Sequence, residues 1–276
     1  MATTRSKELR ALAQRVADAL PAEVIEVVLT GSVSRGMADA VSDVEMLCVT
    51  ERQLSLEEAF EFARGAGLEQ TDSWGDPLTP TRRVFGYLGE QPVETIWWSR
   101  AVAEELFASV GSAEALTNGV ALRTSGLLAG WLERLVDYSD ALATERIERA
   151  AERWGGYAPA ALLTIARDDV ALARMEWLVD SAQRVLAIVF ALNRVPQPTA
   201  KRLAARVEPL AIQPKRLAER IDEALVQPEA RTALRLMAGL QLETVNLAPD
   251  GPNIVRARTW LANAEEVLGR PGPVSA

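Results

Sequence analysis

The chain has 276 residues, of which 49% are apolar and 25% are charged, and it carries a formal net charge of −8. This length is enough for two modest domains, and the composition is ordinary for a globular protein. The sequence contains no histidine. This excludes Ser-His-Asp and Cys-His catalysis and histidine metal sites, so any chemistry must rest on carboxylates, Lys, Arg, Tyr or metal ions.

The charge and the single cysteine also limit the partners and the location of the protein. An acidic balance argues against a nucleic-acid partner, because binding a phosphate backbone needs a basic surface. No run of residues approaches the roughly 20 apolar residues of a membrane span, and the N-terminal stretch lacks the apolar core of a signal peptide. Cys48 has no partner for a disulfide and is expected to be a small core residue. We therefore expect a cytoplasmic protein without a membrane partner; a homodimer is compatible with the sequence.

The first hundred residues show the patterns of a small mixed sheet with helices beside it. Leu9, Leu12 and Val16 recur at helical spacing. Ser55 and Glu58 form a capping box at the start of a later helix. Two apolar runs around Gly89 to Pro92 predict a hairpin, in which Pro92 belongs at the start of its strand. The predicted helices are 4–20, a short one within 33–40, and 55–66; the predicted strands are 24–30, 43–50, 83–88 and 93–98, with 70–80 as a loop or edge segment.

From about Ala101 the periodicity indicates helices throughout. Proline near the start of two of these segments is typical of a first helical turn, and Asn193 with two following prolines ends the longest one. The predicted helices are 101–110, 113–138, 141–154, 159–192, 199–208, 214–226, 228–247 and 253–268.

The stretch Leu29 to Val49 carries the chemistry. An apolar run ends in Gly31-Ser32, and a polar segment leads to Asp43-Val-Glu45 at the start of a second apolar run. Asp43 and Glu45 are two residues apart in a predicted strand, so both carboxylates leave from one face and should repel each other unless a cation lies between them. Mg²⁺ is the natural candidate, because it prefers carboxylate oxygen and binds substrate phosphates. An ordinary turn would explain Gly31-Ser32, but it would not explain Glu45 inside an apolar strand.

This pattern resembles the nucleotidyltransferase superfamily typified by DNA polymerase beta and the antibiotic nucleotidyltransferases. The family motif is Gly-Ser at a strand end, about a dozen residues, and Asp-x-Asp/Glu on the next strand; Gly31, Ser32, Asp43 and Glu45 match it. The family also has a third carboxylate on a later strand, and Glu94 fits. The resemblance covers about the first hundred residues. It implies an α+β fold, with a catalytic domain over 1–100 that contains a small mixed sheet, followed by an all-helical bundle domain over 101–270.

The resemblance also implies an activity. A member of this family would transfer a nucleoside monophosphate, most naturally AMP from ATP, to a hydroxyl of a small acceptor such as an aminoglycoside or lincosamide antibiotic, and so confer antibiotic resistance. Asp43, Glu45 and Glu94 would be the catalytic residues and the ligands of two Mg²⁺ ions. Glu94 would either ligate the metal on the acceptor side or take the hydroxyl proton, with Glu90 and Asp76 the next candidates for this position. The acceptor would lie between the two domains.

Several further residues have a structural explanation beside a functional one. Ser32 is expected to hold the β- or γ-phosphate together with Gly31. Arg35 could reach the triphosphate or be a solvated arginine. Trp98 shares the face of Glu94 and could stack on a base or an acceptor ring, although a core role for Trp97 and Trp98 is the simpler explanation. Lys201 lies just after Asn193, in a stretch that loosely resembles one facing the nucleotide in some family members.

Two other functions stay open on the sequence alone. The same chemistry could act on a protein or a tRNA, as in toxin–antitoxin nucleotidyltransferases, although the acidic balance makes tRNA a poor fit. The chain could also be a nucleotide-binding regulatory protein that does not catalyse. Loss of one carboxylate would be the expected mark of such a protein, and Asp43, Glu45 and Glu94 are all present.

Overall fold

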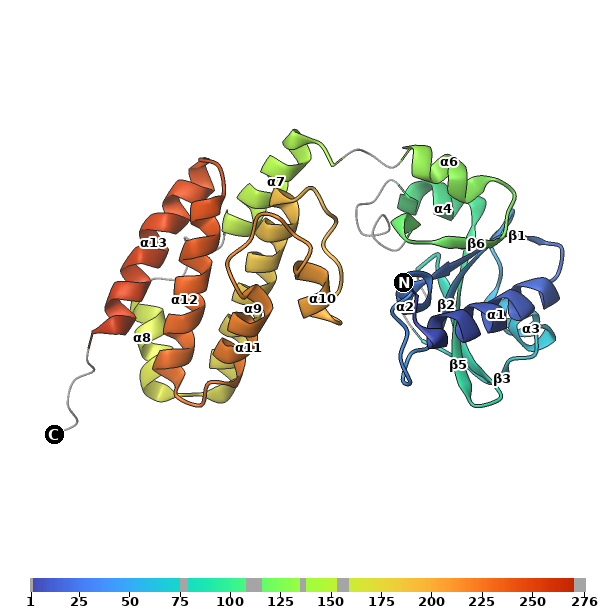
Figure 1. Ribbon diagram of the computed structural model, residues 1–276, viewed down its shortest axis with the longest axis horizontal. Coiled ribbons are helices and arrows are strands. Elements are labelled where there is room, and N and C mark those ends of the chain that lie inside the picture. Colours follow the sequence, from blue (N-terminus) through green and yellow to red (C-terminus); the bar gives the residue numbers. More distant parts are fainter. Residues whose placement is uncertain (1, 75–78, 108–115, 135–137, 153–158, 271–276) are drawn as a thin grey trace. The chain divides into compact units, whose positions relative to one another are not determined.

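The computed structural model divides the chain into two compact units, residues 1–136 and 137–276. It describes residues 2–74, 79–107, 116–134, 138–152 and 159–270. The first unit combines a mixed sheet with helices, and the described part of the second is helical (Figure 1). The predicted α+β class, with a small mixed sheet followed by a helical region, is therefore confirmed.

The sheet of the first unit has six strands in the order β3-β4-β5-β2-β1-β6. Neighbours β2 and β5 run parallel, and the other neighbouring pairs of described strands are antiparallel. The strands are β1 (Val24–Thr30), β2 (Val44–Thr50), β3 (Glu69–Ser73), β4 (Arg82–Leu88), β5 (Gln91–Ser99) and β6 (Val120–Arg123).

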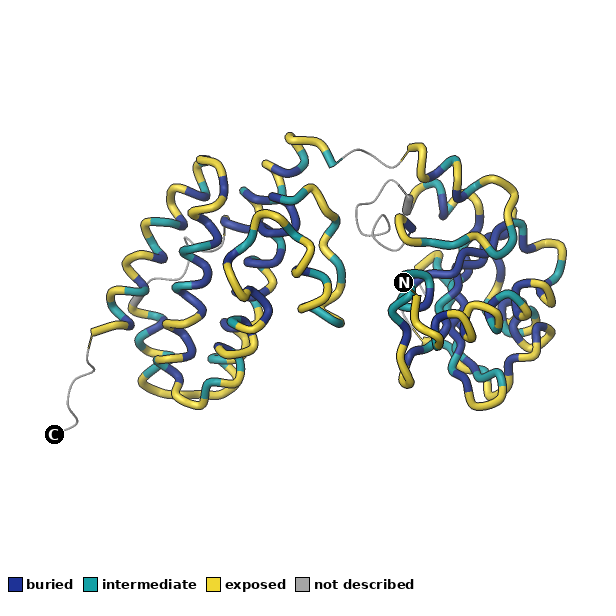
Figure 2. Tube along the Cα trace, in the orientation of Figure 1, coloured by how far each residue is buried: buried dark blue, intermediate teal, exposed yellow. Residues whose placement is uncertain are grey.

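Each face of this sheet has its own apolar core, as strand alternation requires. The central strands are largely buried between these two cores (Figure 2). Even-numbered residues of β2, such as Met46, pack with helices α1 (Thr4–Ala19) and α3 (Leu56–Gly65). Odd-numbered residues, such as Leu47, pack with α4 (Arg100–Phe107) and α6 (Leu127–Arg134). Glu45 lies two residues before Leu47, and Glu94 lies two residues before Ile96. Both glutamates therefore share the α4/α6 face with this second set.

Local sequence signals are confirmed in this unit. The Ser55 hydroxyl accepts a hydrogen bond from the Glu58 amide at 3.2 Å, and the Glu58 carboxylate accepts one from the Ser55 amide at 2.8 Å, which is the predicted capping box. Pro92 lies second in its strand, opposite Tyr87. Cys48 is fully buried in β2, and burial raises the pKa of its thiol.

Strand β6 is the main departure from prediction, because a helix was expected over 113–138. It pairs with β1 and extends the sheet, so the first unit continues past the predicted boundary at residue 100. Arg123 of β6 donates to four carbonyls at and after the end of α1, from Ala17, Leu20, Pro21 and Val24, at 2.6–2.9 Å. These non-local bonds override the weak helical pattern of Val120–Arg123.

Helix α6 is held to the same strand pair by a buried carboxylate. Glu26 of β1 is 0% exposed and accepts from the amides of Ser125, Leu127 and Leu128 at 2.6, 3.3 and 3.2 Å. An acidic group at the first turn of a helix satisfies amides that have no partner within the helix. The segment 120–134 is therefore an integral part of the sheet unit.

The second unit packs its helices around one apolar core. The helix predicted over 159–192 is broken at Asp169, whose φ is +42°, and Arg174 donates both to its carboxylate and to the Pro228 carbonyl at 2.9 Å. The helices are α7 (Asp140–Glu152), α8 (Pro159–Asp168), α9 (Ala171–Leu192), α10 (Leu203–Val207), α11 (Leu217–Val226), α12 (Ala230–Leu247) and α13 (Pro252–Gly269). Helix α10 is half the predicted length. Within the described ranges, no helix is both long enough and apolar enough to cross a membrane.

The role of Arg123 can be tested by thermodynamics. Arg123→Met keeps the aliphatic stem but removes the donors to four carbonyls, so we expect the free energy of unfolding of the sheet unit to fall by about 2–3 kcal/mol. Arg10→Met, on an exposed position of α1, should change it by less than about 0.5 kcal/mol. Denaturant unfolding followed by circular dichroism measures both, and equal effects would contradict the assigned role.

Candidate active site

The sequence motif lies at one end of the sheet, where β1 ends and β2 begins. These strands are antiparallel, and Thr30, the last residue of β1, pairs with Glu45. Gly31 follows directly, so the Gly31-Ser32 turn and the first residues of β2 are neighbours in space. The two halves of the motif are thus brought together by the register of one strand pair.

Gly31 and Glu45 are in close contact. Gly31 has a φ of +69°, and a Cβ atom built on it would lie 1.7 Å from Oε2 of Glu45. A Cβ at this position would force the Glu45 carboxylate to move, because real Cβ atoms essentially never approach another heavy atom within 3.0 Å. The Glu45 carboxylate therefore occupies the space above the turn that only glycine leaves open.

Glu94 lies directly beside Glu45 in the neighbouring strand. The parallel register of β2 and β5 pairs Val44 with Val93 and Glu45 with Glu94. Both glutamates leave the same face of the sheet. Glu94 is 7% exposed, and Glu45 is half-buried. Asp43 is half-buried and directly precedes β2, so all three predicted carboxylates come from the same end of the sheet.

Arg83 contacts this group from the next strand. Its Nη1 donates to Oε1 of Glu94 at 3.2 Å, and its guanidinium carbon lies 4.4 Å from the ring centroid of Trp74. Arg83 pairs with Ile96 across β4 and β5, so its side chain points to the α4/α6 face. A cation thus already balances part of the acidic charge. Arg83 was not among the predicted site residues, although the register of the predicted hairpin places it beside the strand of Glu94.

The donor set fits Mg²⁺ only when a substrate supplies further ligands. Among the described residues, no group of three or more His, Cys, Asp or Glu side chains is placed to hold a metal ion. Mg²⁺, however, usually takes one or two carboxylates and completes its coordination with water and substrate phosphates. Asp43 and Glu45, two half-buried carboxylates beside a glycine turn, suit that mode. To bind a metal ion as well, the Glu94 carboxylate would have to keep Arg83 on one oxygen or break its ion pair with Arg83.

The phosphate-side residues lie in and directly after a short helix. The helix expected within 33–40 is instead α2 (Gly31–Ser34), which is a single turn. It ends because Gly36 has a φ of +73° and the following loop is bonded to the first turn of α1. Ser32 and Arg35 are both half-buried, and Arg35 is the C-cap of α2.

The two tryptophans have different environments. Trp97 is 1% exposed, donates to the Thr95 hydroxyl at 2.9 Å and packs edge-on against Phe62. It is a core residue. Trp98 is half-buried on the Glu94 face and packs with the α4/α6 core of its own unit.

The predicted residues of the second unit are described within that unit alone. Lys201 is exposed in that unit, and its role at a nucleotide stays a prediction. Asn193 is the C-cap of α9; its amide donates to the carbonyls of Val189 and Ile212 at 2.8 Å, which is the structural role expected for a cap. Arg167 pairs with Asp168 at 2.7 Å on the surface.

Two alternative third carboxylates remain. Glu90 lies exposed in the β4–β5 turn and lines a cavity of about 840 Å³ on the α1 side of the sheet, away from Glu94. Asp76 lies outside the described residues. Of Glu90 and Glu94, Glu94 is therefore the better placed to act with Glu45.

Comparisons with known proteins add little. No protein-family model and no curated protein matches the chain. Among solved structures it is similar to a nucleotidyltransferase-like protein from Exiguobacterium sibiricum, with 13% identity over 96% of this chain and 74% of that chain, and a TM-score of 0.30. Likeness at this level carries no weight for the activity, so the functional case rests on the residues of the site.

Gly31→Ala tests the contact with Glu45. Gly89→Ala is a matched control, because Gly89 has a similar φ of +63° but nothing lies within 4 Å of an added Cβ. We expect Gly89→Ala to cost about 1 kcal/mol of unfolding free energy through backbone strain alone. Gly31→Ala should cost more and should also abolish Mg·ATP binding measured by calorimetry. Equal effects in the two variants would show that Glu45 is not held by this glycine.

Arg83→Met tests the competition between the guanidinium and a metal ion for Glu94. Removing a partly exposed cation beside this carboxylate should raise the affinity for Mg²⁺ about three- to tenfold, after allowance for solvent screening. Arg82→Met is the control, because Arg82 binds backbone carbonyls of Thr79 and Thr81 instead. Titration of each variant with Mg²⁺ alone measures the effect, and an unchanged affinity in Arg83→Met would contradict it.

Proposed function

We propose that this protein transfers a nucleoside monophosphate, AMP from ATP, to a hydroxyl group of a small acceptor such as an aminoglycoside or lincosamide antibiotic. The observation that supports this most directly is the pairing of Glu45 with Glu94 across β2 and β5, beside the glycine turn at Gly31. Adjacent acidic side chains on one sheet face are costly without a cation. Glycine carries no side chain, so a phosphate could approach the backbone of this turn once the Glu45 carboxylate turns toward a metal ion.

Each residue has a defined task in this proposal. Asp43 and Glu45 hold Mg²⁺ together with the triphosphate, and Gly31 and Ser32 contact the phosphates. Bound Mg²⁺ would neutralise phosphate charge and lower the pKa of the acceptor hydroxyl. The hydroxyl oxygen forms a bond to the α-phosphorus, the bond from that phosphorus to the α–β bridging oxygen breaks, and pyrophosphate leaves. Glu94 accepts the hydroxyl proton or orients the hydroxyl. Arg35 and Lys201 are secondary candidates for the triphosphate.

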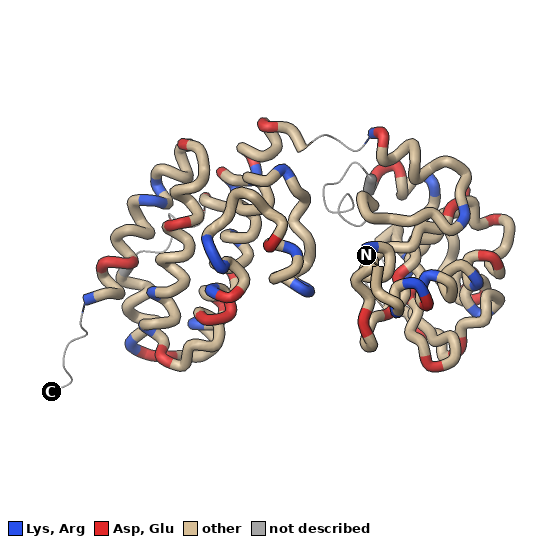
Figure 3. The backbone as a smooth tube through the Cα atoms, in the orientation of Figure 1, with Lys and Arg blue, Asp and Glu red and all other residues tan. Residues whose placement is uncertain are grey.

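Most of the rate in such a transfer comes from positioning and charge stabilisation. A rigid strand pair that fixes two carboxylates in register suits this requirement. The acidic balance of the chain favours a small, neutral or cationic acceptor over tRNA. Acidic and basic positions occur on both units (Figure 3).

A second candidate is a nucleotide-binding protein without transferase activity. The ion pair between Arg83 and Glu94 favours it, because a third carboxylate held by an arginine is a poorer proton acceptor and metal ligand. In that case Mg·ATP would still bind through Asp43 and Glu45, but no acceptor would be modified.

Turnover and binding measured on the same variants separate these functions. Pyrophosphate release and acceptor mass shift are scored with each NTP and pooled antibiotics, and Mg·ATP affinity is measured by calorimetry. We expect Glu45→Gln to lose both binding and turnover. We expect Glu94→Gln to lower kcat by about 10²–10⁴-fold, the range for a lost general base, with a smaller loss of affinity.

The controls decide between the outcomes. Glu61→Gln, on an exposed position of α3, should behave like wild type. Near wild-type turnover in Glu94→Gln would show that another carboxylate acts as the third, and Glu90→Gln is then the next variant. Mg·ATP binding without any product in the wild-type protein would favour the regulatory function. No Mg·ATP binding would refute both.

A further inference from the structure

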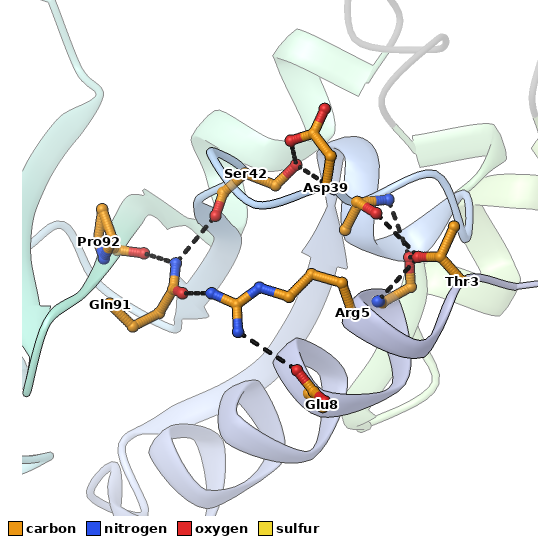
Figure 4. Close-up of polar contacts among 9 residues, drawn as sticks. Thr3, Arg5, Glu8, Asp39, Ser42, Gln91 and Pro92 are labelled. Atoms are coloured by element: carbon orange, nitrogen blue, oxygen red, sulfur yellow. Dashed lines mark hydrogen bonds and ion pairs between the residues drawn. The ribbon is translucent and has the colours of Figure 1, made fainter.

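A side chain behind the candidate site links the starts of the two strands that carry it. Gln91 is the first residue of β5 and is 9% exposed. It lies two residues before Val93 and therefore shares its face. This face packs against α1 and is the opposite side of the sheet from Glu94. Its amide nitrogen donates to the Ser42 carbonyl at 3.0 Å and the Pro92 carbonyl at 3.1 Å, and its Oε1 accepts from Arg5 (Figure 4).

The chemistry of this position requires glutamine. Arginine can only donate hydrogen bonds, and the two carbonyls can only accept them. The linking side chain must therefore offer an acceptor to Arg5 and two donors to Ser42 and Pro92. A glutamate would keep the acceptor but would place an oxygen against two carbonyls, and a methionine would offer neither.

The bonded backbone lies directly before the carboxylates. Ser42 precedes Asp43, and Pro92 lies two residues before Glu94. The Ser42 hydroxyl also donates to the Asp39 carboxylate at 2.8 Å and accepts from the Asp39 amide at 2.9 Å, which closes the turn before β2 (Figure 4). The Gln91 amide thus bonds both to Ser42, directly before β2, and to Pro92 in its own strand β5. The relative position of these two strand starts determines how Glu45 lies beside Glu94.

The first turn of α1 anchors the same loop. Arg5 belongs to this turn and is held by Glu8 at 3.4 Å. The Thr3 hydroxyl donates to the Ala38 carbonyl at 2.9 Å, and the Ala38 amide donates to the Ser6 hydroxyl at 2.9 Å. The loop between Ser32 and Asp43 is therefore bonded at two points. Ala38 bonds to the start of α1, and Ser42 bonds to Gln91 of β5, which Arg5 of α1 contacts in turn.

We propose that Gln91, oriented by Arg5, is a positioning residue that holds the starts of β2 and β5 in the register that a Mg·nucleotide requires. This inference rests on the proposed function, because it concerns the same carboxylates. Gln91 touches neither substrate nor metal in this role. It acts through the backbone of Ser42 and Pro92.

The test compares two glutamines that bond to backbone carbonyls. Gln91→Met removes the link, and Gln14→Met removes a bond of similar kind, because the Gln14 amide donates to the Leu122 carbonyl at 3.0 Å on the far β6 edge. Binding of Mg·ATP is measured by calorimetry on folded protein, with hydrogen exchange to confirm folding. We expect Gln91→Met to weaken binding about tenfold, as for a lost buried hydrogen-bond link, and Gln14→Met to leave it unchanged.

Three further variants sharpen the result. Gln91→Glu should weaken binding at least as much as Gln91→Met, since it keeps only the bond to Arg5. Arg5→Met should have a smaller effect, and the double variant Arg5→Met/Gln91→Met should lose no more than Gln91→Met alone, because the two residues act in one chain of bonds. Wild-type affinity in Gln91→Glu, or equal losses in Gln91→Met and Gln14→Met, would overturn the inference.

The proposed function fails in a distinguishable way. If wild type binds Mg·ATP and Glu45→Gln does not, while Gln91→Met binds like wild type, only the positioning role is wrong. If wild type binds no Mg·ATP, the proposed function is wrong, and the positioning role is overturned with it.

Discussion

The carboxylate of Glu45 fills the space that a side chain at position 31 would need, and the rest of the site depends on this contact. A side chain at position 31 would displace this carboxylate, and the φ of +69° at Gly31 also favours glycine. The same strand register that places Glu45 over Gly31 also places it beside Glu94. One backbone arrangement therefore places a glycine turn and a pair of acids side by side.

The two faces of the sheet carry different groups of residues at the end where β2 begins. The α4/α6 face carries the acids, together with Arg83 and Trp74, which can respond to a ligand. The α1 face carries Arg5, Gln91 and the bonds to the loop, which are buried or half-buried and hold the backbone. Such a separation lets the reactive face change partners while the strand ends keep their positions. The pairing of Arg83 with Glu94 is what an active enzyme would have to rearrange.

Local patterns predicted the fold well where local physics decides it. The limits of β1, the capping box at Ser55 and the buried Cys48 follow from alternation, capping and burial within a few residues. Strand β6 and the break at Asp169 could not be predicted in this way, because they depend on contacts with residues about 60 to 100 positions away. The same holds for the site: Gly31, Asp43 and Glu45 form a motif, whereas Arg83 and Gln91 acquire their roles only through strand pairing.

The place of β6 in the sheet has a consequence for how the chain is made. During synthesis the first hundred residues emerge with β1 as an open edge, a long apolar strand with unpaired amides and carbonyls. Such edges pair readily with other chains and cause aggregation. The sheet is protected only when residues 120–123 have left the ribosome and β6 has covered β1. A fragment that contains the sheet unit alone should therefore end after residue 134, so that Glu26 and Arg123 both keep their hydrogen-bond partners.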